Sequence, residues 1–302
     1  MSLAAPRKTP STKAALKSVA LRRIANAQAE AARGPKAAAP HELRKRCKEI
    51  RGLLHMVGPG LRDHAALDSL ARDAARGLAP ARDAEVMLDC LDRLTARLRR
   101  PAQFAGLRQR LLDDIARHSA ESRAGALADY ITAFARLEHA FAGLDLSDKA
   151  QRVIWAGVAR TWARARKRQA RARAAFEDSP EQGAFDATAL HDWRKEVKRH
   201  WYQAQFLAPI RPARMAPHIA RIDALGETLG AHNDLDTLMR FLDHQAGLDP
   251  ADAQARDILH LHALNERRHL ARLALAEAGP LLDTKPKALA RRWARWWRKW
   301  RR

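Results

Sequence analysis

Two segments of the chain carry the pattern His-x-x-Arg-Lys-x-x-Lys, whose spacing places all four side chains on one face of an α-helix. The residues are His41, Arg44, Lys45 and Lys48 in the first segment and His191, Arg194, Lys195 and Lys198 in the second. Arginine presents a planar fork of donors that matches phosphate oxygens, and lysine presents a mobile point charge. Cations that repeat along a helical face therefore match a linear polyanion, whose charges also repeat along a line.

The opposite face of each segment is apolar, with Leu43, Cys47 and Ile50 in the first and Trp193 and Val197 in the second. Each helix can therefore pack into a core while its basic face stays at a surface. A single basic face of this kind is typical of ordinary solvated helices. The two copies lie 150 residues apart (191 − 41), and a solvated face has no need to keep its spacing twice. The repetition thus favours a functional surface.

Two more pairs of segments match at similar offsets. Residues 81–87 (ARDAEVM) correspond to residues 232–238 (HNDLDTL), at an offset of 151 (232 − 81). A fainter match places Arg23 and Arg164 each five residues before a glutamine. Three ordered matches predict that the chain is a duplication of a unit of about half its length.

These paired segments resemble the CHAD family, the conserved histidine α-helical domain, from about residue 13 to the end of the chain. The resemblance implies two helical bundles related by a pseudo-twofold axis, with a basic channel between them. It also implies binding of inorganic polyphosphate and association with polyphosphate granules. The sequence differs from the family pattern at Glu49, where a further basic residue is common, and at His232-Asn233, where Ala-Arg is usual.

The predicted polyphosphate site consists of the two patterned segments and the basic residues near them. Two such helices facing each other across a twofold axis would concentrate positive potential along a channel. Asp83, Asp234 and Asp236 are expected to orient nearby cations by charge pairing and not to act as acids or bases. The predicted binding residues are Arg23, His41, Arg44, Lys45, Lys48, Arg51, Arg82, Arg164, Arg168, His191, Arg194, Lys195, Lys198, Arg199 and Tyr202.

The charge of the chain agrees with an acidic partner. It has 302 residues, with 56 lysines and arginines against 34 aspartates and glutamates, a net charge of +22 and a pI near 11.1. Folding does not require this imbalance, which adds self-repulsion. It favours polyphosphate, nucleic acid or an anionic membrane surface as partner. Polyphosphate is preferred, and weak nucleic-acid binding by a nucleoid-associated protein is the alternative, although no helix-turn-helix, RNA-recognition or zinc motif supports it.

The sequence contains no motif of an enzyme or of a cofactor site. It lacks the P-loop, the dinucleotide-binding GxGxxG, the GxSxG nucleophile elbow and HExxH. Thirteen histidines raise the question of a metal, but His41 and His191 stand beside cationic residues that repel a divalent ion. We therefore expect a binding protein without catalysis, cofactor or metal. A phosphatase acting on polyphosphate is a further alternative.

The fold is predicted to be all-α, because alanine and leucine dominate the apolar residues and β-branched residues are sparse. We expect a disordered basic tail at residues 1–12, a first helical bundle at 13–145 and a second at 146–302. Proline and glycine mark the expected helix ends. Gly230 in particular is expected to end one helix, with residues 233–234 capping the next.

A cytoplasmic protein at polyphosphate granules is the expected location. No apolar run is long enough to span a membrane. Cys47 and Cys90 lie at periodic apolar positions, which favours buried, reduced thiols.

The C-terminal segment KALARRWARWWRKWRR has Trp293, Trp296, Trp297 and Trp300 at spacings of three and four residues. We interpret these tryptophans as packing on the second bundle, with the arginines extending the basic surface. Docking on a membrane surface and stacking on nucleic-acid bases are the alternatives.

Overall fold

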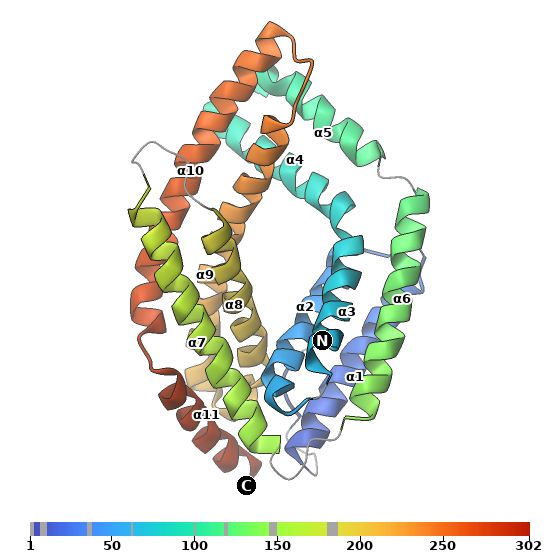
Figure 1. Ribbon diagram of the computed structural model, residues 1–302, viewed down its shortest axis with the longest axis vertical. Helices are drawn as coiled ribbons and strands as arrows, with labels where there is room; N and C mark the ends of the chain where they lie inside the picture. Colours follow the sequence, from blue (N-terminus) through green and yellow to red (C-terminus); the bar gives the residue numbers. More distant parts are fainter. Residues whose placement is uncertain are drawn as a thin grey trace.

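Figure 1 shows a computed structural model of the chain, which describes residues 3–6, 11–34, 38–61, 63–99, 101–117, 120–144, 150–179 and 187–302. Within these residues every regular element is a helix, and the predicted all-α fold is confirmed. Three short 3₁₀ turns are η1 (Gly58–Gly60), η2 (Pro101–Phe104) and η3 (Ala208–Ile210). The α-helices are α1 (Thr12–Ala31), α2 (Pro40–Val57), α3 (His64–Gly77), α4 (Ala79–Leu98), α5 (Ala105–Arg117), α6 (Ala120–Ala142), α7 (Ala150–Glu177), α8 (Ala187–Phe206), α9 (Pro212–Asp243), α10 (Pro250–Leu282) and α11 (Pro286–Arg301).

The helices form two groups that lie side by side (Figure 1). α1, α2, α3 and α6 pack together in one group, and α7, α8, α9 and α10 in the other, with α11 lying against α7. α4 and α5 extend over one end of the molecule and reach α9 and α10. α2 makes the main contact of the first group with α7 and α8. The two basic segments, in α2 and α8, therefore lie at the junction between the groups.

Local sequence explains where the basic helices begin and end. α2 starts with Pro40 in its first turn, where a missing N–H removes no intrahelical hydrogen bond. It ends at Gly58-Pro59-Gly60, which forms η1. α8 ends at Phe206, just before the turn η3 that contains Pro209. Proline and glycine thus mark these boundaries as the sequence predicts.

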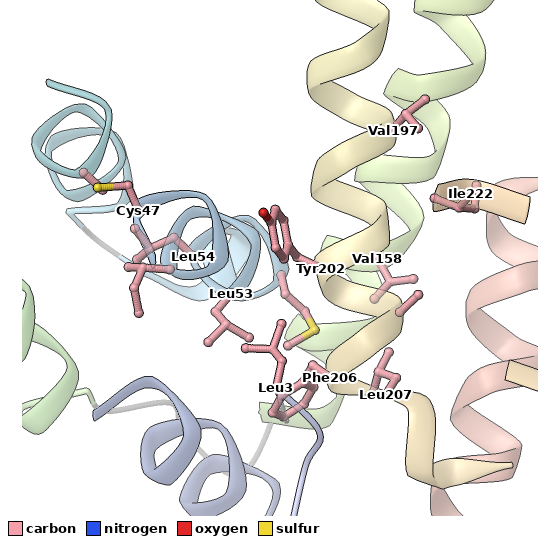
Figure 2. Packing of buried hydrophobic residues seen from close by; sticks show 14 of the residues in the cluster. Leu3, Cys47, Leu53, Leu54, Val158, Val197, Tyr202, Phe206, Leu207 and Ile222 are labelled. Atoms are coloured by element: carbon pink, nitrogen blue, oxygen red, sulfur yellow. The ribbon is translucent and has the colours of Figure 1, made fainter. Parts of the chain in front are cut away.

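Two hydrophobic clusters hold the helices together. The larger cluster joins both groups, and Figure 2 shows Leu53 of α2 and Phe206 of α8 converging with Leu3. The smaller cluster joins α4, η2 and α5 to α9 and α10. Each cluster therefore takes residues from both parts of the chain. The domain boundary predicted near residue 145 falls on residues 145–149, outside the described residues.

Part of the N-terminal segment predicted to be a disordered tail packs on α8 in the structure. Leu3 and Ala5 are buried, and the Ala5 N–H donates a hydrogen bond to the Phe206 carbonyl oxygen at 2.8 Å. Thr12 Oγ1, at the start of α1, accepts a hydrogen bond from the Trp297 indole N–H at 3.2 Å. Residues 1–2 and 7–10 lie outside the described part of the chain.

α9 corrects the helix end predicted at Gly230. It continues without interruption from Pro212 to Asp243, so residues 233–234 cap nothing. Glycine inside a helix costs about 1 kcal/mol relative to alanine, so this glycine needs another reason. A Cβ atom at residue 230 would lie 3.6 Å from Arg194 Nε, which shows that the arginine packs directly over it. The glycine lies inside α9 beneath Arg194 and does not end the helix.

The tryptophans of α11 divide into two kinds. Trp293 and Trp297 are buried, and Trp297 packs against Trp155 of α7 with ring centroids 6.1 Å apart. Trp296 and Trp300 are partly exposed. All four tryptophans thus pack against the larger hydrophobic cluster, Trp296 and Trp300 at its partly buried edge, which agrees with the packing interpreted from the sequence. Among the described residues no helix is long and apolar enough to cross a membrane.

Candidate functional site

α2 and α8 cross where Gly52 lies against Tyr202, whose ring points toward α2 in Figure 2. A Cβ atom on Gly52 would lie 2.6 Å from the Tyr202 Cβ atom, closer than two side chains can pack. α2 also rests on α7, where a Cβ atom on Gly157 would lie 2.0 Å from the Met56 carbonyl oxygen. These two glycines let the first basic helix approach α7 and α8 directly. Gly52 and Tyr202 are 150 positions apart (202 − 52), the offset of the two basic patterns.

Cations from both helices act on one carboxylate, that of Glu227 in α9. The Lys198 ammonium lies 2.5 Å from Glu227 Oε1 and 3.3 Å from Asp223 Oδ1. Its hydrogen bond lowers the pKa of Glu227, and the charges of Arg194 and Lys48 lower it further. Because Lys48 belongs to α2, the positive potentials of the two basic segments overlap at α9.

Two glycines of α9 lie beneath the second basic pattern. A Cβ atom on Gly226 would be 3.0 Å from Lys198 Cε, and one on Gly230 would be 3.6 Å from Arg194 Nη2. Residues four apart share a face on each helix, so each glycine lies against one cation of α8, most tightly at Gly226. Lys198 also lies over the Trp201 ring, 4.9 Å from its centroid. The long cationic side chains of α8 are thus held between α9 and neighbouring side chains.

The histidine of the second pattern is oriented by α9. His191 Nδ1–H donates a hydrogen bond to Asn233 Oδ1, which can only accept. Burial lowers the pKa of His191, and Lys195 and Arg194 lower it further. The lowered pKa favours the neutral ring in the free protein. A bound polyanion would raise this pKa by supplying the opposite charge.

Three outer cations of the predicted site lie in surface ion pairs. Lys195 Nζ is 3.1 Å from Asp192 Oδ1, and Arg168 Nη1 of α7 is 2.9 Å from Asp192 Oδ2. Lys45 Nζ is 3.8 Å from Glu42 Oε1. Exposed pairs of this kind contribute about 0–1 kcal/mol. An anionic ligand can therefore replace these carboxylates at little cost.

The first pattern is more open to solvent than the second. His41 and Lys48 are exposed, and Arg44 is partly buried. In the second pattern only Lys195 is exposed, and the Lys198 side chain keeps 20% of its accessible surface. The difference follows from α9, which covers the second pattern.

α2 and α8 each contain an Arg–Glu ion pair at corresponding positions, but the arginine and the glutamate have exchanged places. Arg46 Nη1 lies 2.9 Å from Glu49 Oε2 in α2, and Arg199 pairs with Glu196 in α8. The positions correspond at the offset of 150 (196 − 46 and 199 − 49). Glu49 also lies 3.5 Å from Arg23 Nε in α1. Burial lowers the pKa of Arg23, and Glu49 opposes this effect. Glu49, which stands where the family pattern is usually basic, therefore balances the charge of the buried Arg23.

A second group of predicted cations surrounds Asp68 of α3. Arg51 Nε lies 2.8 Å from Asp68 Oδ1. Burial lowers the pKa of Arg199; Glu196 opposes this, while Arg51 and Arg164 lower it further. The charges of Arg51, Asp68 and Arg164 therefore all act on Arg199, separately from the cations around Glu227.

Two predicted binding residues are buried. Arg23 is 2% exposed and held by Glu49, and Tyr202 is 5% exposed and fills the crossing of α2 and α8. In this arrangement both position their neighbours and neither is presented to solvent. The side chain of Arg82, in α4, lies outside the described residues. Of the predicted orienting carboxylates, Asp236 forms an ion pair with Arg267, at 2.7 Å.

Sequence reasoning missed the polar partners that α9 supplies, namely Asp223, Glu227 and Asn233. Their signal was a four-residue repeat, since Asp223 and Glu227 share a helical face, as do Gly226 and Gly230. A helix break assumed at Gly230 separated Asn233 from the others and concealed the pattern.

The structure defines an α-helical protein in which two matched basic helices meet at one crossing. The family model described as the CHAD domain matches residues 16–243, and the chain belongs to this family. The resemblance stated from the sequence is thereby confirmed. No curated protein sequence matches the chain.

Two solved structures share this fold. The crystal structure of the CHAD domain from the plant Ricinus communis has 22% sequence identity and a TM-score of 0.61, covering 87% of this chain and 89% of that one. PptA from Streptomyces chartreusis has 20% identity and a TM-score of 0.64, covering 87% of this chain and 95% of that one. At these identities the likeness concerns the fold.

Proposed function

We propose that this chain binds inorganic polyphosphate along the basic residues of α2 and α8, without hydrolysing it. The observation that supports the proposal most directly is the overlap of charge at Glu227, where Lys48 of α2 acts together with Arg194 and Lys198 of α8. Membership of the CHAD family agrees with a role connected to polyphosphate. An association with polyphosphate granules follows from the same proposal.

The ligand proposed here replaces carboxylates that already occupy the basic surface. Asp192 and Glu227 hold Lys195 and Lys198 in the free protein, at 3.1 Å and 2.5 Å. A phosphate chain carries a negative charge on every unit, so it can satisfy several cations at once. Successive turns of a helix present cations about 5.4 Å apart, which gives a chain of phosphates repeated contacts along one line.

Binding without hydrolysis is proposed because the carboxylates of the site are poor bases. The Lys198 hydrogen bond lowers the pKa of Glu227, which weakens its ability to take a proton from water. Asp223 lies 3.3 Å from the same ammonium and has the same counterion role. These groups therefore act as internal competitors of the ligand.

The test is a titration with long-chain polyphosphate at several salt concentrations, with duplex DNA as competitor. We expect polyphosphate to displace DNA at physiological salt, and polyphosphate affinity to fall steeply as salt rises, by release of counterions. K48A/K198A should weaken binding and flatten the salt slope without loss of helical content. K285A/K287A is the matched control, because it removes two exposed lysines at the start of α11.

Each result of this titration bears on the proposal. Equal losses in the two double variants would mean that net charge alone sets the affinity and that α2 and α8 are not the site. Preferential retention of DNA in the competition would favour the nucleic-acid-binding alternative. Release of orthophosphate from polyphosphate by the purified protein would overturn binding without hydrolysis.

A further inference from the structure

A second basic hollow lies between the start of α9 and α11, away from the crossing of α2 and α8. Its volume is about 440 Å³. It is lined by Arg211, Arg214, His218, Arg292, Trp293, Arg295 and Trp296. Four of these seven residues are arginines and none is acidic, so the hollow combines positive charge with an aromatic wall.

The four arginines converge from different parts of the chain. Arg211 precedes α9, Arg214 lies in its first turn, and Arg292 and Arg295 are one turn apart on α11. None of the four forms an ion pair with a carboxylate in the part of the chain that the structure describes. The first turn of α9 holds no acidic residue, so the positive end of the helix dipole adds to the same charge. Like charges are thus gathered here without an internal counterion.

Aromatic contacts hold two of the guanidinium groups at the hollow. The Arg211 Cζ atom lies 5.3 Å from the centroid of the Trp296 ring, and the Arg292 Cζ atom lies 5.8 Å from it. The Arg292 Nε–H is buried and has no acceptor among the described residues. A buried donor without an acceptor is costly, and a ligand oxygen in the hollow is the kind of group that would satisfy it.

A packed wall separates this hollow from the basic face of α8. His218, which lines the hollow, lies 2.9 Å from His200 of α8 between their Nε2 atoms. His200 is fully buried and stacks on Trp293, with ring centroids 5.3 Å apart. Burial lowers the pKa of His218 to about 4, and Arg292 contributes to this. The hollow is therefore a distinct site, backed by neutral histidines.

We propose that this hollow binds an oligovalent phosphate anion of the triphosphate class, independently of the site on α2 and α8. Guanidinium forks match phosphate oxygens in pairs, and a multivalent anion would relieve the repulsion among four of them. The volume falls within the range of about 300–1,000 Å³ typical of small-ligand sites. The recognised group is the triphosphate itself, whether free or carried by a nucleoside.

The test is calorimetric titration with sodium tripolyphosphate at constant ionic strength, in the K48A/K198A background. We expect that R214A/R295A, made in this background, weakens the remaining binding about tenfold or more, since each arginine donates charge-assisted hydrogen bonds. R291A/R298A is the matched control, because it removes two exposed arginines of α11 that do not line the hollow. The control should bind as the background does.

A second readout does not depend on those variants. The indole N–H signal of Trp296, assigned by its loss in W296F, should shift in NMR spectra during the titration. Equal shifts with ATP and tripolyphosphate would identify the triphosphate group as sufficient, and a shift with tripolyphosphate alone would restrict the site to inorganic chains. An unmoved Trp296 signal, or equal affinities of R214A/R295A and R291A/R298A, would overturn the proposal. Failure of the α2–α8 site would appear separately, as unchanged polyphosphate binding by K48A/K198A.

Discussion

α2 and α8 carry the same basic pattern, but the rest of the chain surrounds the two copies differently. The pattern of α8 lies over α9, a single helix of 32 residues that supplies Asp223, Glu227 and Asn233 as partners. The segments after α2 form two helices, α3 with 14 residues and α4 with 20. His41 and Lys48 of α2 are exposed, whereas their counterparts in α8 are partly buried.

This difference suggests that α2 and α8 contribute differently to anion binding at one surface. In α8 carboxylates hold the cations in place. An anion that binds must displace these carboxylates, which costs binding free energy, but the cations are already positioned before it arrives. In α2 Lys48 is exposed, so its position is less constrained before binding, and ordering it costs conformational entropy. Matched substitutions in the two helices can test whether the copies are energetically unequal.

The largest expected contrast concerns the exchanged ion pairs. E49Q breaks the buried ion pair with Arg23 and the pair with Arg46, and should lower the free energy of unfolding by about 3 kcal/mol, because breaking a buried ion pair is costly. E196Q at the matching position should cost about 1 kcal/mol, because the side chain of Arg199 is 18% exposed and reaches solvent. Urea denaturation measures both values. Equal losses would mean that the two pairs have the same role.

The crossing itself provides the next test. G52A places a Cβ atom 2.6 Å from the Tyr202 Cβ atom, which cannot rotate away because it is fixed to the backbone of α8. The variant should lose about 1–3 kcal/mol of unfolding free energy and separate α2 from α8. G125A is the control, since no atom lies within 4 Å of the added Cβ, and it should gain about 0.5–1 kcal/mol in its helix. A stable G52A with unchanged polyphosphate affinity would contradict the close crossing.

Several features of this comparison were predictable from the sequence. Helical period alone places His41, Arg44 and Lys48 on one face, and the repetition at an offset of 150 indicates that both copies matter. The all-α fold follows from composition. Prolines and glycines predict most helix ends, because these residues act locally on the backbone.

Other features depend on tertiary packing that a single sequence does not reveal. Gly230 has the same local preferences whether it ends a helix or lies beneath Arg194, and only the arginine above it distinguishes the two. Arg23 resembles any other cation in sequence, yet Glu49 allows it to be buried. The acidic partners of Lys198 come from a helix about 25 residues further on, and their four-residue repeat does not say which helix they face.

Acidification should destabilise the fold through a buried histidine that has no counterpart at the matching position in the first half of the chain. His232 of α9 corresponds to Ala81 at the offset of 151 (232 − 81). Burial lowers the pKa of His232 to about 3, and Arg267 and His191 contribute. At pH values between about 6.5 and 3, His232 therefore binds a proton in the unfolded chain but stays neutral in the folded chain. The associated stability is fully present above pH 6.5 and is lost progressively as the pH falls toward 3.

The expected size of this pH effect is set by linkage. One proton changes the slope of unfolding free energy by up to about 1.4 kcal/mol per pH unit. H232Q should flatten the slope between pH 6 and pH 4 by up to this amount, measured by urea denaturation at each pH. H262Q is the control, because His262 is exposed on α10, and it should leave the slope nearly unchanged. An identical slope in H232Q would contradict the buried neutral state.

Single lysine substitutions compare the two helices as binding surfaces. K48A should weaken polyphosphate binding about tenfold and K198A about threefold, because Lys48 is exposed to a ligand whereas Lys198 is partly buried against Asp223 and Glu227. The two variants change the net charge equally, so a nonspecific charge effect predicts equal losses. Fluorescence titration at one salt concentration measures both. A larger loss for K198A would mean that the preordered cation contributes more than the exposed one.

The smallest expected effect comes from removing the internal competitor. E227Q leaves Lys198 without its nearest carboxylate and should strengthen polyphosphate binding about threefold, by roughly 0.6 kcal/mol. E266Q removes one negative charge from α10, where Glu266 pairs with Arg97 at 2.9 Å, and serves as the control for net charge. The gain in E227Q should disappear when K198A is added, because the displaced ion pair no longer exists. A gain of equal size in E227Q, E266Q and the E227Q/K198A double variant would show that Glu227 acts only through net charge, and the proposed inequality between α2 and α8 would lose its physical basis.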